Sequence, residues 1–379
     1  MFDVLLSLAI SFTITFLAIP AIITVAESKK LFDVPDERKI HKAHIPSLGG
    51  LGIFAGFMLA SLLSIRLGAA SEFQYFLAAA LVMFFLGLKD DILVISPIKK
   101  FIGQVLASFL IIYKGNVQIT SMHGFLGINE LPEMFGIMLT YFTIIVIINS
   151  FNLIDGIDGL AGTLGIISAA IFGSYFLAAG MVPYAVMGFA LAGSLTAFLI
   201  FNYHPARIFM GDTGSMLIGL VNAILVVKFI SVAQSPGAGV QVFAAPAVGF
   251  TVLLIPLLDT LRVFGIRIFH QRSPFIPDRN HIHHLMLDKG WSHNTITFTL
   301  ASFSVVFVAA AYLFRSVGCT WIILAGVTLF FSGIATLYYT RRHPRMFVAR
   351  IEGSKPEHQG TKIVPLTKDI VLEQQNLKG

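Results

Sequence analysis

Long apolar runs recur along the whole chain, and they constrain its fold more than any other feature. A run of about 20 apolar residues is long enough to cross a bilayer as a helix. Hydrophobic residues make up 56% of the chain and charged residues only 12%, so little sequence is left for a water-soluble domain. The pattern predicts an all-α polytopic integral membrane protein.

We place eleven transmembrane helices, and the first lacks the basic flank and cleavage site of a signal peptide, so we expect it to be retained. Pro246 and Pro256 predict kinks in the ninth span, because proline removes a helix hydrogen bond. The spans are expected at 3–26, 48–67, 72–89, 99–113, 132–150, 159–179, 183–201, 213–232, 241–266, 295–315 and 317–340. Alternating residues and glycines in 116–132 indicate a small hairpin between two of them.

The charged residues sort to one side of this predicted membrane. With the N-terminus outside, most of the 26 Lys and Arg residues fall in loops on the opposite side, which the positive-inside rule makes cytoplasmic. Most acids and histidines fall there too. The basic balance favours anionic headgroups and phosphates and gives no argument for nucleic acid. We expect a transmembrane catalytic domain over 1–340 and a basic cytoplasmic tail over 341–379.

A polar stretch separates two of the apolar runs. Asn149, Asn152, Asp155 and Asp158 recur every three residues, with Gly156 inside the series. Ionisable groups at such a seam are costly unless they face a cavity, a cation or a ligand, and glycine lets a ligand come close. A plain polar loop between two membrane helices is the alternative.

Two adjacent acids, Asp90 and Asp91, end the third span, and a Ser-Pro-Ile-Lys-Lys segment containing Lys100 opens the fourth. Neighbouring carboxylates at a membrane boundary can ligate a divalent cation or share a proton, which raises one pKa toward that of a usable base. As a solvated helix C-terminus the pair would be poorly placed, since the helix dipole disfavours anions there.

Glycines gather around the starts of the second and eighth spans. Ahead of the eighth span, Gly211 to Ser215 surrounds Asp212 with glycines and hydroxyls, which suits a metal-held phosphate over a helix N-terminus. Asp212 could equally be a plain N-cap, and Phe209 could stack on a base or simply pack. At the start of the second span, Gly49 and Gly50 follow a basic loop and could offer amides to an anion. A topology-setting loop with a flexible joint is the alternative.

The histidine cluster His281-Ile-His283-His284 has two interpretations. It could bind a transition metal, but no cysteine accompanies it, because the single cysteine, Cys319, lies in an apolar run. Acids on the same face suit Mg²⁺ or Mn²⁺, and the imidazoles would then donate hydrogen bonds to phosphates. We favour the second interpretation.

Five segments in this order resemble the polyprenyl-phosphate N-acetylhexosamine-1-phosphate transferases, glycosyltransferase family 4, over about residues 1–340. They are RKxHxxxxPxxGG (38–50), DDxxxxSPxxKF (90–101), NxxNxxDGxDGLA (149–161), FNxxPAxxFMGDTGS (201–215) and HIHH (281–284). The similarity is closest to bacterial UDP-N-acetylglucosamine–undecaprenyl-phosphate transferases that start cell-surface polysaccharides. The peptidoglycan branch, which transfers phospho-N-acetylmuramoyl-pentapeptide, typically carries three consecutive histidines instead.

The resemblance implies a Mg²⁺-dependent transfer of sugar 1-phosphate from a UDP-N-acetylhexosamine to undecaprenyl phosphate, on the cytoplasmic face of the inner membrane, by a protein that is commonly a dimer. It makes Asp212 the metal ligand and Asp90 the base that deprotonates the lipid phosphate, with Asp91 assisting orientation or metal binding. The remaining matched residues are Asn152, Asp155, Gly156 and Asp158 around the nucleotide; Asn202 and Phe209 at the uracil; Lys39, Lys42 and Lys100 at phosphates; and Arg267, His281, His283 and His284 at the diphosphate and sugar.

The alternative function from a different class is that of a membrane transporter or lipid flippase. Such proteins keep carboxylates and glycines in broken helices near the membrane midplane and often show related halves. In this chain the acids collect at one predicted surface and no repeat is evident, so the sequence favours the transferase.

Overall fold

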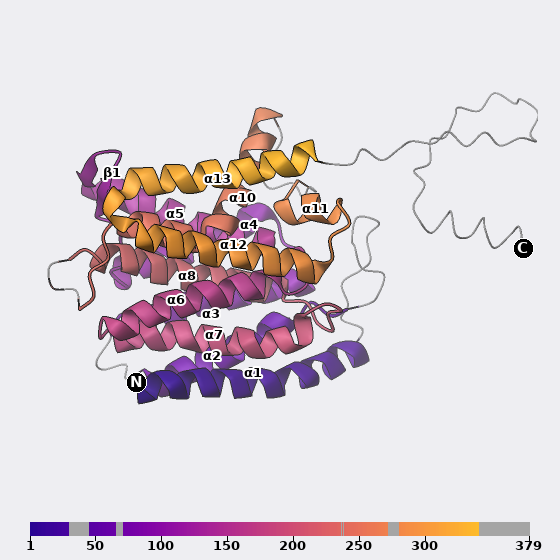
Figure 1. Ribbon diagram of the computed structural model, residues 1–379. Coiled ribbons are helices and arrows are strands. Elements are labelled where there is room, and N and C mark those ends of the chain that lie inside the picture. Colours follow the sequence, from indigo (N-terminus) through magenta and orange to yellow (C-terminus); the bar gives the residue numbers. More distant parts are fainter. Residues whose placement is uncertain (30–44, 66–70, 236, 238, 272–279, 341–379) are drawn as a thin grey trace, which may run out of the picture.

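The computed structural model describes residues 1–29, 45–65, 71–235, 237, 239–271 and 280–340. Within them the chain is a helical bundle with one small hairpin (Figure 1). The elements are α1 (Phe2–Lys29), α2 (Gly49–Ser64), α3 (Phe73–Ile92), α4 (Pro97–Phe109), a π-helical turn (Leu110–Lys114), β1 (Ser121–Phe125), β2 (Ile128–Glu130), α5 (Glu133–Ile154), α6 (Leu160–Ala178), α7 (Val182–Asn202), α8 (Gly211–Val232), α9 (Ala245–Val252), α10 (Leu254–Phe269), α11 (Ile282–Leu287), α12 (His293–Leu313), a 3₁₀ turn (Arg315–Val317) and α13 (Cys319–Tyr339). The predicted tail and the loop that carries Lys39 and Lys42 lie outside the described residues.

Each predicted span coincides with helical structure, and the prediction of an all-α polytopic membrane protein is confirmed. The expected count of eleven crossings stays a prediction: by length and composition, seven of the described helices could cross a membrane, or eight if the bent pair α9 and α10 counts as one. With 16 residues, α2 is about 24 Å long at 1.5 Å per residue, short of a hydrocarbon core of about 30 Å, whereas α4 continues through the π-helical turn to Lys114.

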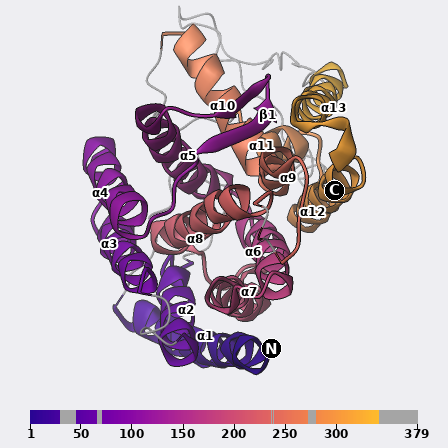
Figure 2. The same ribbon diagram turned by 90° about the vertical axis from the view of Figure 1, so that its left-hand side faces the viewer.

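The predicted ninth span is broken. Its two parts, α9 and α10, meet at Leu253 and are bent by 79°. Pro246 lies in the first turn of α9 and Pro256 in that of α10. Proline is tolerated in a first turn, where its missing N–H has no intrahelical partner. The two prolines therefore mark two helix starts in place of kinks in one helix, and Figure 2 shows α10 leaving the side of the bundle.

The expected hairpin is present. β1 and β2 are antiparallel, with Phe125 paired to Ile128. Leu126 and Gly127 between them have φ values of 52° and 80°, which is the backbone of a two-residue turn with both central residues left-handed. In Figure 1 the hairpin lies at the same end of the bundle as the N-terminus, and the chain leaves α13 at the opposite end.

α8 occupies the centre of the bundle, with α2, α3, α5, α6 and α7 around it (Figure 2). Of its most apolar stretch 83% is buried, against 22% for α1 and α13 at the periphery. α1 and α2 approach closely where Thr15 Oγ1 donates to the Gly52 carbonyl at 3.0 Å. A Cβ at Gly56 would lie 2.1 Å from Thr15 Oγ1, so only glycine permits this crossing.

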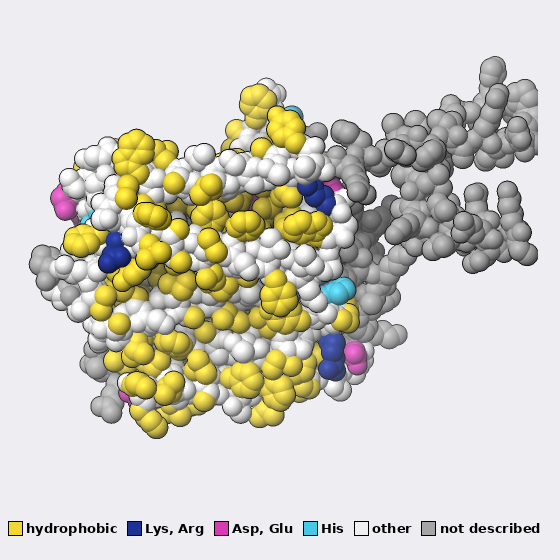
Figure 3. All heavy atoms as spheres, in the orientation of Figure 1, with side chains coloured by type: hydrophobic (Ala, Val, Ile, Leu, Met, Phe, Trp, Pro, Cys, Tyr) yellow, Lys and Arg dark blue, Asp and Glu magenta, His cyan; other side chains and the backbone are white. Residues whose placement is uncertain are grey.

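The outer surface fits a lipid environment. In Figure 3 hydrophobic side chains cover the middle of the visible face, and charged groups gather toward its two ends. Large apolar side chains such as Leu17, Phe298 and Trp321 are more than half exposed. Because contiguous apolar surface of this extent is unfavourable in water, we take the face to contact acyl chains.

Candidate active site

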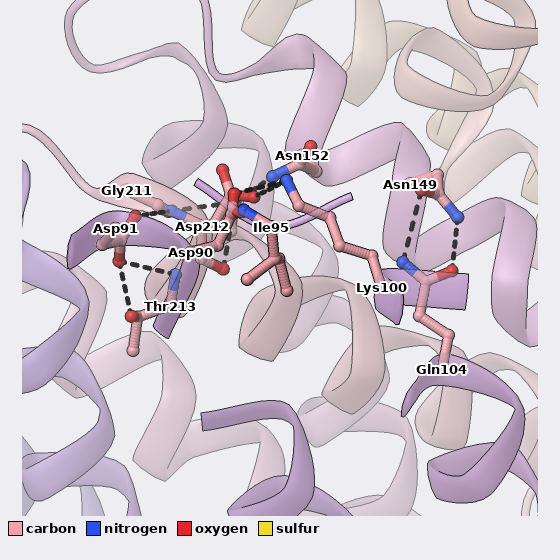
Figure 4. A network of polar contacts seen from close by, with 11 residues as sticks. Asp90, Asp91, Ile95, Lys100, Gln104, Asn149, Asn152, Gly211, Asp212 and Thr213 are labelled. Atoms are coloured by element: carbon pink, nitrogen blue, oxygen red, sulfur yellow. Dashed lines mark hydrogen bonds and ion pairs between the residues drawn. The ribbon is translucent and has the colours of Figure 1, made fainter. Parts of the chain in front are cut away.

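Three helix ends meet at the end of the bundle opposite the hairpin, and they carry the acidic motifs. Asp90 ends α3, Lys100 begins α4 and Asp212 begins α8. The Lys100 Nζ lies 2.5 Å from an oxygen of Asp90 and 2.5 Å from an oxygen of Asp212 (Figure 4). The side chains are 12–26% exposed, so the three charges share a partly enclosed site. The sequence prediction that these motifs converge is therefore confirmed for Asp90, Lys100 and Asp212.

Asp91 caps the N-terminus of α8. Its Oδ1 accepts the Asp212 amide at 2.7 Å, and its Oδ2 accepts the amide and the hydroxyl of Thr213 at 3.0 and 2.5 Å. A carboxylate is unfavourable at the C-terminus of its own helix, but here it lies at the positive end of another. The interpretation of Asp212 as a plain N-cap is wrong: it lies inside the first turn of α8 and makes no capping bond.

This cap predicts a graded effect on stability. Asp91→Ala leaves two amides without their acceptor and should cost about 2–4 kcal/mol of unfolding free energy. Thr213→Val removes only the hydroxyl contact and should cost about 1 kcal/mol. Thermal melting of the purified protein in detergent is the measurement. Equal melting temperatures for Asp91→Ala and the wild type would contradict the capping role.

The seam between α5 and α6 faces the same cluster. The Asn152 amide donates to Ser215 Oγ at 3.0 Å and also contacts the Asp212 carboxylate. Asp155 follows α5 directly; burial raises the pKa of its carboxyl to about 8, and nearby acidic charges, that of Asp212 first, add to the shift. Asn149, one turn earlier, instead forms a paired amide contact with Gln104 on α4, at 2.9 and 3.3 Å (Figure 4). Because Gln104 lies one turn after Lys100, this contact fixes the face of α4 that presents Lys100.

The glycine-rich start of α2 does not offer its amides to an anion. The Gly49 amide donates to the Phe209 carbonyl at 2.9 Å, and the Gly50 amide donates to that of Met210 at 2.8 Å. A Cβ on Gly50 would lie 2.3 Å from the Gly214 amide nitrogen. The expectation of an anion site here is therefore wrong: the glycines allow α2 to cross the start of α8 and to hold the backbone that carries Phe209.

The histidine cluster reaches the site through Gly156. His281 and His283 have parallel rings 5.7 Å apart, and the ring of His284 lies 4.3 Å from that of His283. A Cβ on Gly156 would lie 2.2 Å from Nε2 of His283, so the imidazole packs directly on this glycine. Burial lowers the pKa of His283 to about 3. His283 is therefore a neutral imidazole at physiological pH, with a single N–H to donate.

This contact makes Gly156 sensitive to a single methyl group. Gly156→Ala should push the His283 ring away from Asp155 and lower turnover by roughly 10- to 100-fold, as outer contacts of a site do when lost. Gly333→Ala in α13, where nothing lies within 4 Å of the added Cβ, is the matched control. The measurement is the initial catalytic rate of each variant. Equal rates for Gly156→Ala and Gly333→Ala would contradict the packing of His283 on Gly156.

Asp158 and Asn202 make contacts that the motifs did not suggest. Asp158 Oδ2 lies 2.7 Å from Nδ1 of His204 and 3.4 Å from Nδ1 of His293. The Asn202 amide accepts from the Gly159 backbone and donates to the Ile208 carbonyl, both at 2.9 Å. Asn202 thus ties together the loops before α6 and α8. Among the described residues His204 and His293 are functional candidates missed by sequence reasoning: His204 occupies an unassigned position of the 201–215 segment, and His293 lies outside all five segments.

The other predicted site residues are placed less directly. Arg267 on α10 is buried, with its guanidinium 5.8 Å from the ring centre of Phe264. Phe209 is half-buried, and its amide donates to the Pro46 carbonyl at 2.8 Å. Lys39 and Lys42 fall outside the described residues.

The donor set fits a hard divalent cation. Asp90 and Asp212 already converge on one cation, the Lys100 ammonium, and their neighbour Asn152 adds an amide. Carboxylate and amide oxygens are the ligands that Mg²⁺ prefers. Asp91 fits less well as a ligand, because three hydrogen bonds to α8 occupy its oxygens. Its geometry agrees with the expectation that it orients its neighbours.

Comparison with known proteins identifies a family and several relatives. A family model described as glycosyl transferase family 4 matches residues 73–230. A decaprenyl-phosphate N-acetylglucosaminephosphotransferase of Mycobacterium leprae is 32% identical over 350 residues, covering 86% of this chain and 87% of that protein. An undecaprenyl-phosphate alpha-N-acetylglucosaminyl 1-phosphate transferase of Yersinia pestis is 30% identical, covering 75% of each chain. A probable undecaprenyl-phosphate N-acetylglucosaminyl 1-phosphate transferase of Bacillus subtilis is 28% identical, covering 83% of this chain and 86% of that protein.

Proposed function

Because this chain belongs to glycosyl transferase family 4, we propose that it transfers N-acetylglucosamine 1-phosphate from UDP-N-acetylglucosamine to undecaprenyl phosphate and releases UMP. The transfer of N-acetylglucosamine 1-phosphate to a polyprenyl phosphate is common to the named relatives. The identity of the UDP donor and the length of the lipid are the finer parts of the proposal. The product would be the first lipid-linked intermediate of a cell-surface polysaccharide.

The reaction exchanges one phosphoryl bond for another. An oxygen of the lipid phosphate attacks the β-phosphorus of the UDP-sugar, a new P–O–P bond forms, and the bond to the α-phosphate breaks so that UMP leaves with the electron pair. Both substrates are anions, so catalysis depends on charge neutralisation and alignment. The observation that carries the proposal is the ion-paired cluster of Asp90, Lys100 and Asp212, formed where the ends of three helices meet.

Each residue of the cluster then has a distinct task. Asp90 accepts the remaining proton of the lipid phosphate and makes it a better nucleophile. The Lys100 ammonium gives up its ion pairs with the two carboxylates and pairs with phosphate oxygens as the substrates enter. Asp91 holds the first turn of α8, and so Asp212, in place. His283 packs on Gly156, the residue after Asp155, with the His284 ring beside it, and both would donate hydrogen bonds to the diphosphate or the sugar.

Mg²⁺, or Mn²⁺ in its place, would be held by Asp212 with Asn152 nearby, and when bound it supplies charge stabilisation for the departing UMP. Asp155 lies close enough to feel the charge of Asp212 and completes an oxygen-rich wall. The lipid phosphate sits at headgroup depth and the UDP-sugar is water-soluble, so the site has to lie at a membrane boundary. We assign this boundary to the cytoplasmic face of the inner membrane, following the excess of Lys and Arg in the loops at that end.

The proposal is tested with purified protein, undecaprenyl phosphate and Mg²⁺, using radiolabelled UDP-N-acetylglucosamine. We expect a butanol-soluble labelled lipid and an equal amount of UMP. Replacing the donor in turn with other UDP-N-acetylhexosamines and with UDP-N-acetylmuramoyl-pentapeptide defines the sugar. Product only from the pentapeptide donor would favour the peptidoglycan branch, and no product from any donor would refute the transferase.

A further inference from the structure

Asp259 on α10 is a buried carboxylate that no motif of the site accounts for. Its side chain is 1% exposed, and it lies in the helix that follows the 79° bend. Oδ1 accepts a hydrogen bond from Nη2 of Arg262 at 2.8 Å and from the Ile282 amide at 2.9 Å. Oδ2 has one partner, the Nδ1 of His281, at 2.8 Å. An ionised carboxylate this deeply buried is retained only when each oxygen is bonded, and here the bonds are divided between two tasks.

The first task is to hold the backbone around α11. Arg262 Nη2 contacts Asp259 and also the Asn280 carbonyl. Together with the Ile282 amide, these contacts clamp the chain on both sides of His281 to one turn of α10. All of these backbone-holding contacts are made by Oδ1 of Asp259 or by the Arg262 guanidinium. Oδ2 of Asp259 takes no part in them, so holding the backbone does not explain its hydrogen bond to His281.

The second task concerns the imidazole of His281. A carboxylate oxygen can only accept, so Nδ1 of His281 must carry the proton in this contact. That fixes the tautomer and leaves Nε2, on the far edge of the ring, to meet a substrate either as an acceptor or, when the ring is charged, as a donor. No described residue bonds Nε2. The same ring lies parallel to that of His283, which packs on Gly156 beside Asp155.

We propose that Asp259 is a positioning residue that locks His281 in the Nδ1–H form and aims its Nε2 at the phosphate-transfer site. The inference rests on the proposed function and adds to it a residue that touches neither substrate. Carboxylates behind an imidazole commonly set both its tautomer and its orientation, and their removal costs about 10- to 100-fold where the imidazole is a metal ligand. Sequence reasoning missed this partner because Asp259 lies within an apolar run on α10, whereas His281 precedes α11, 22 residues further along the chain.

Asp259→Asn tests the tautomer separately from the clamp. The amide oxygen of asparagine can still accept from Arg262 and from the Ile282 amide, whereas its NH₂ group then faces Nδ1 of His281. Two donors cannot share that contact, so the imidazole must move its proton to Nε2. We expect kcat to fall by roughly 10- to 100-fold while KM for UDP-N-acetylglucosamine changes less than about threefold and the melting temperature stays near that of the wild type.

Arg262→Gln is the matched comparison, because it weakens the clamp and leaves the bond between Asp259 and His281 intact. It should lower the melting temperature more than it lowers kcat. Parallel losses of kcat and melting temperature in both variants would mean that the cluster is only structural and would overturn the proposal. A normal kcat for Asp259→Asn would overturn it as well. Wild-type protein is assayed alongside: no lipid product from it would refute the proposed function, whereas an active wild type with an unaffected Asp259→Asn would refute this inference alone.

Discussion

Asp212→Asn is expected to lower the rate of lipid-linked product formation by about a thousandfold. The Asp212 carboxylate contacts both Lys100 and Asn152, and the Asp91 cap fixes its position at the start of α8. Asparagine keeps the shape but removes the charge that would hold Mg²⁺ against two anionic substrates. Because Asp212 makes no capping bond, the fold should survive the change.

The measurement is the initial rate over a wide range of Mg²⁺ concentrations. If Asp212 holds the metal, the residual activity of Asp212→Asn should need more Mg²⁺ for half-saturation than the wild type needs. Asp3→Asn, the same chemical change at an exposed position in the first turn of α1, is the control and should leave the rate unchanged. An Asp212→Asn variant with wild-type rate and Mg²⁺ dependence would contradict the role.

Asp90→Asn is expected to reduce turnover by about 10²- to 10⁴-fold, the usual contribution of a general base. One oxygen of Asp90 accepts the Ile95 amide at 2.8 Å and the other contacts Lys100, so the carboxylate is fixed in direction. A base that removes the last proton of the lipid phosphate matters most when that proton is present. A phosphate monoester loses it with a pKa of about 6. The defect of Asp90→Asn should therefore shrink as the pH rises from about 6 to 8.5.

The pH series separates two roles for Asp90. The half-saturating Mg²⁺ concentration should stay at the wild-type value in Asp90→Asn, in contrast to Asp212→Asn. A defect of the same size at every pH would mean that Asp90 serves only to hold Lys100 and is not the base. The wild-type protein measured over the same pH range provides the reference for substrate ionisation.

The sequence was sufficient for the helical class, the position of nearly every helix and the hairpin at 121–130. These features depend on local information: long apolar runs, turn residues and the spacing of charges. It also placed Asp90, Lys100 and Asp212 at one membrane boundary, because alternating spans put the ends of their helices on the same side. The family motifs identified the same residues independently, because each of the five polar segments can be recognised from its own short stretch of sequence.

The sequence was less informative about the length and the bend of individual helices. Two of the expected spans differ in shape from a single long helix: α2 has only 16 residues, and the ninth apolar run is two helices bent by 79°. An apolar run indicates that a segment is shielded from water, but it does not distinguish a helix that faces lipid from one that is packed against protein. Length and bend depend on neighbouring helices, which a hydropathy pattern does not contain.

By itself, then, the sequence determined which residue types stand at the ends of which helices, and through that the chemistry the protein can perform. The tertiary structure decided which partner each polar group contacts. Asp91 caps a helix that begins 120 residues later in the chain, Asp158 contacts His293, and Asp259 forms a hydrogen bond with His281. The physical reason is that a hydrogen bond depends on direction and on distances of about 3 Å. Contacts of that kind between distant segments are set only when the helices pack.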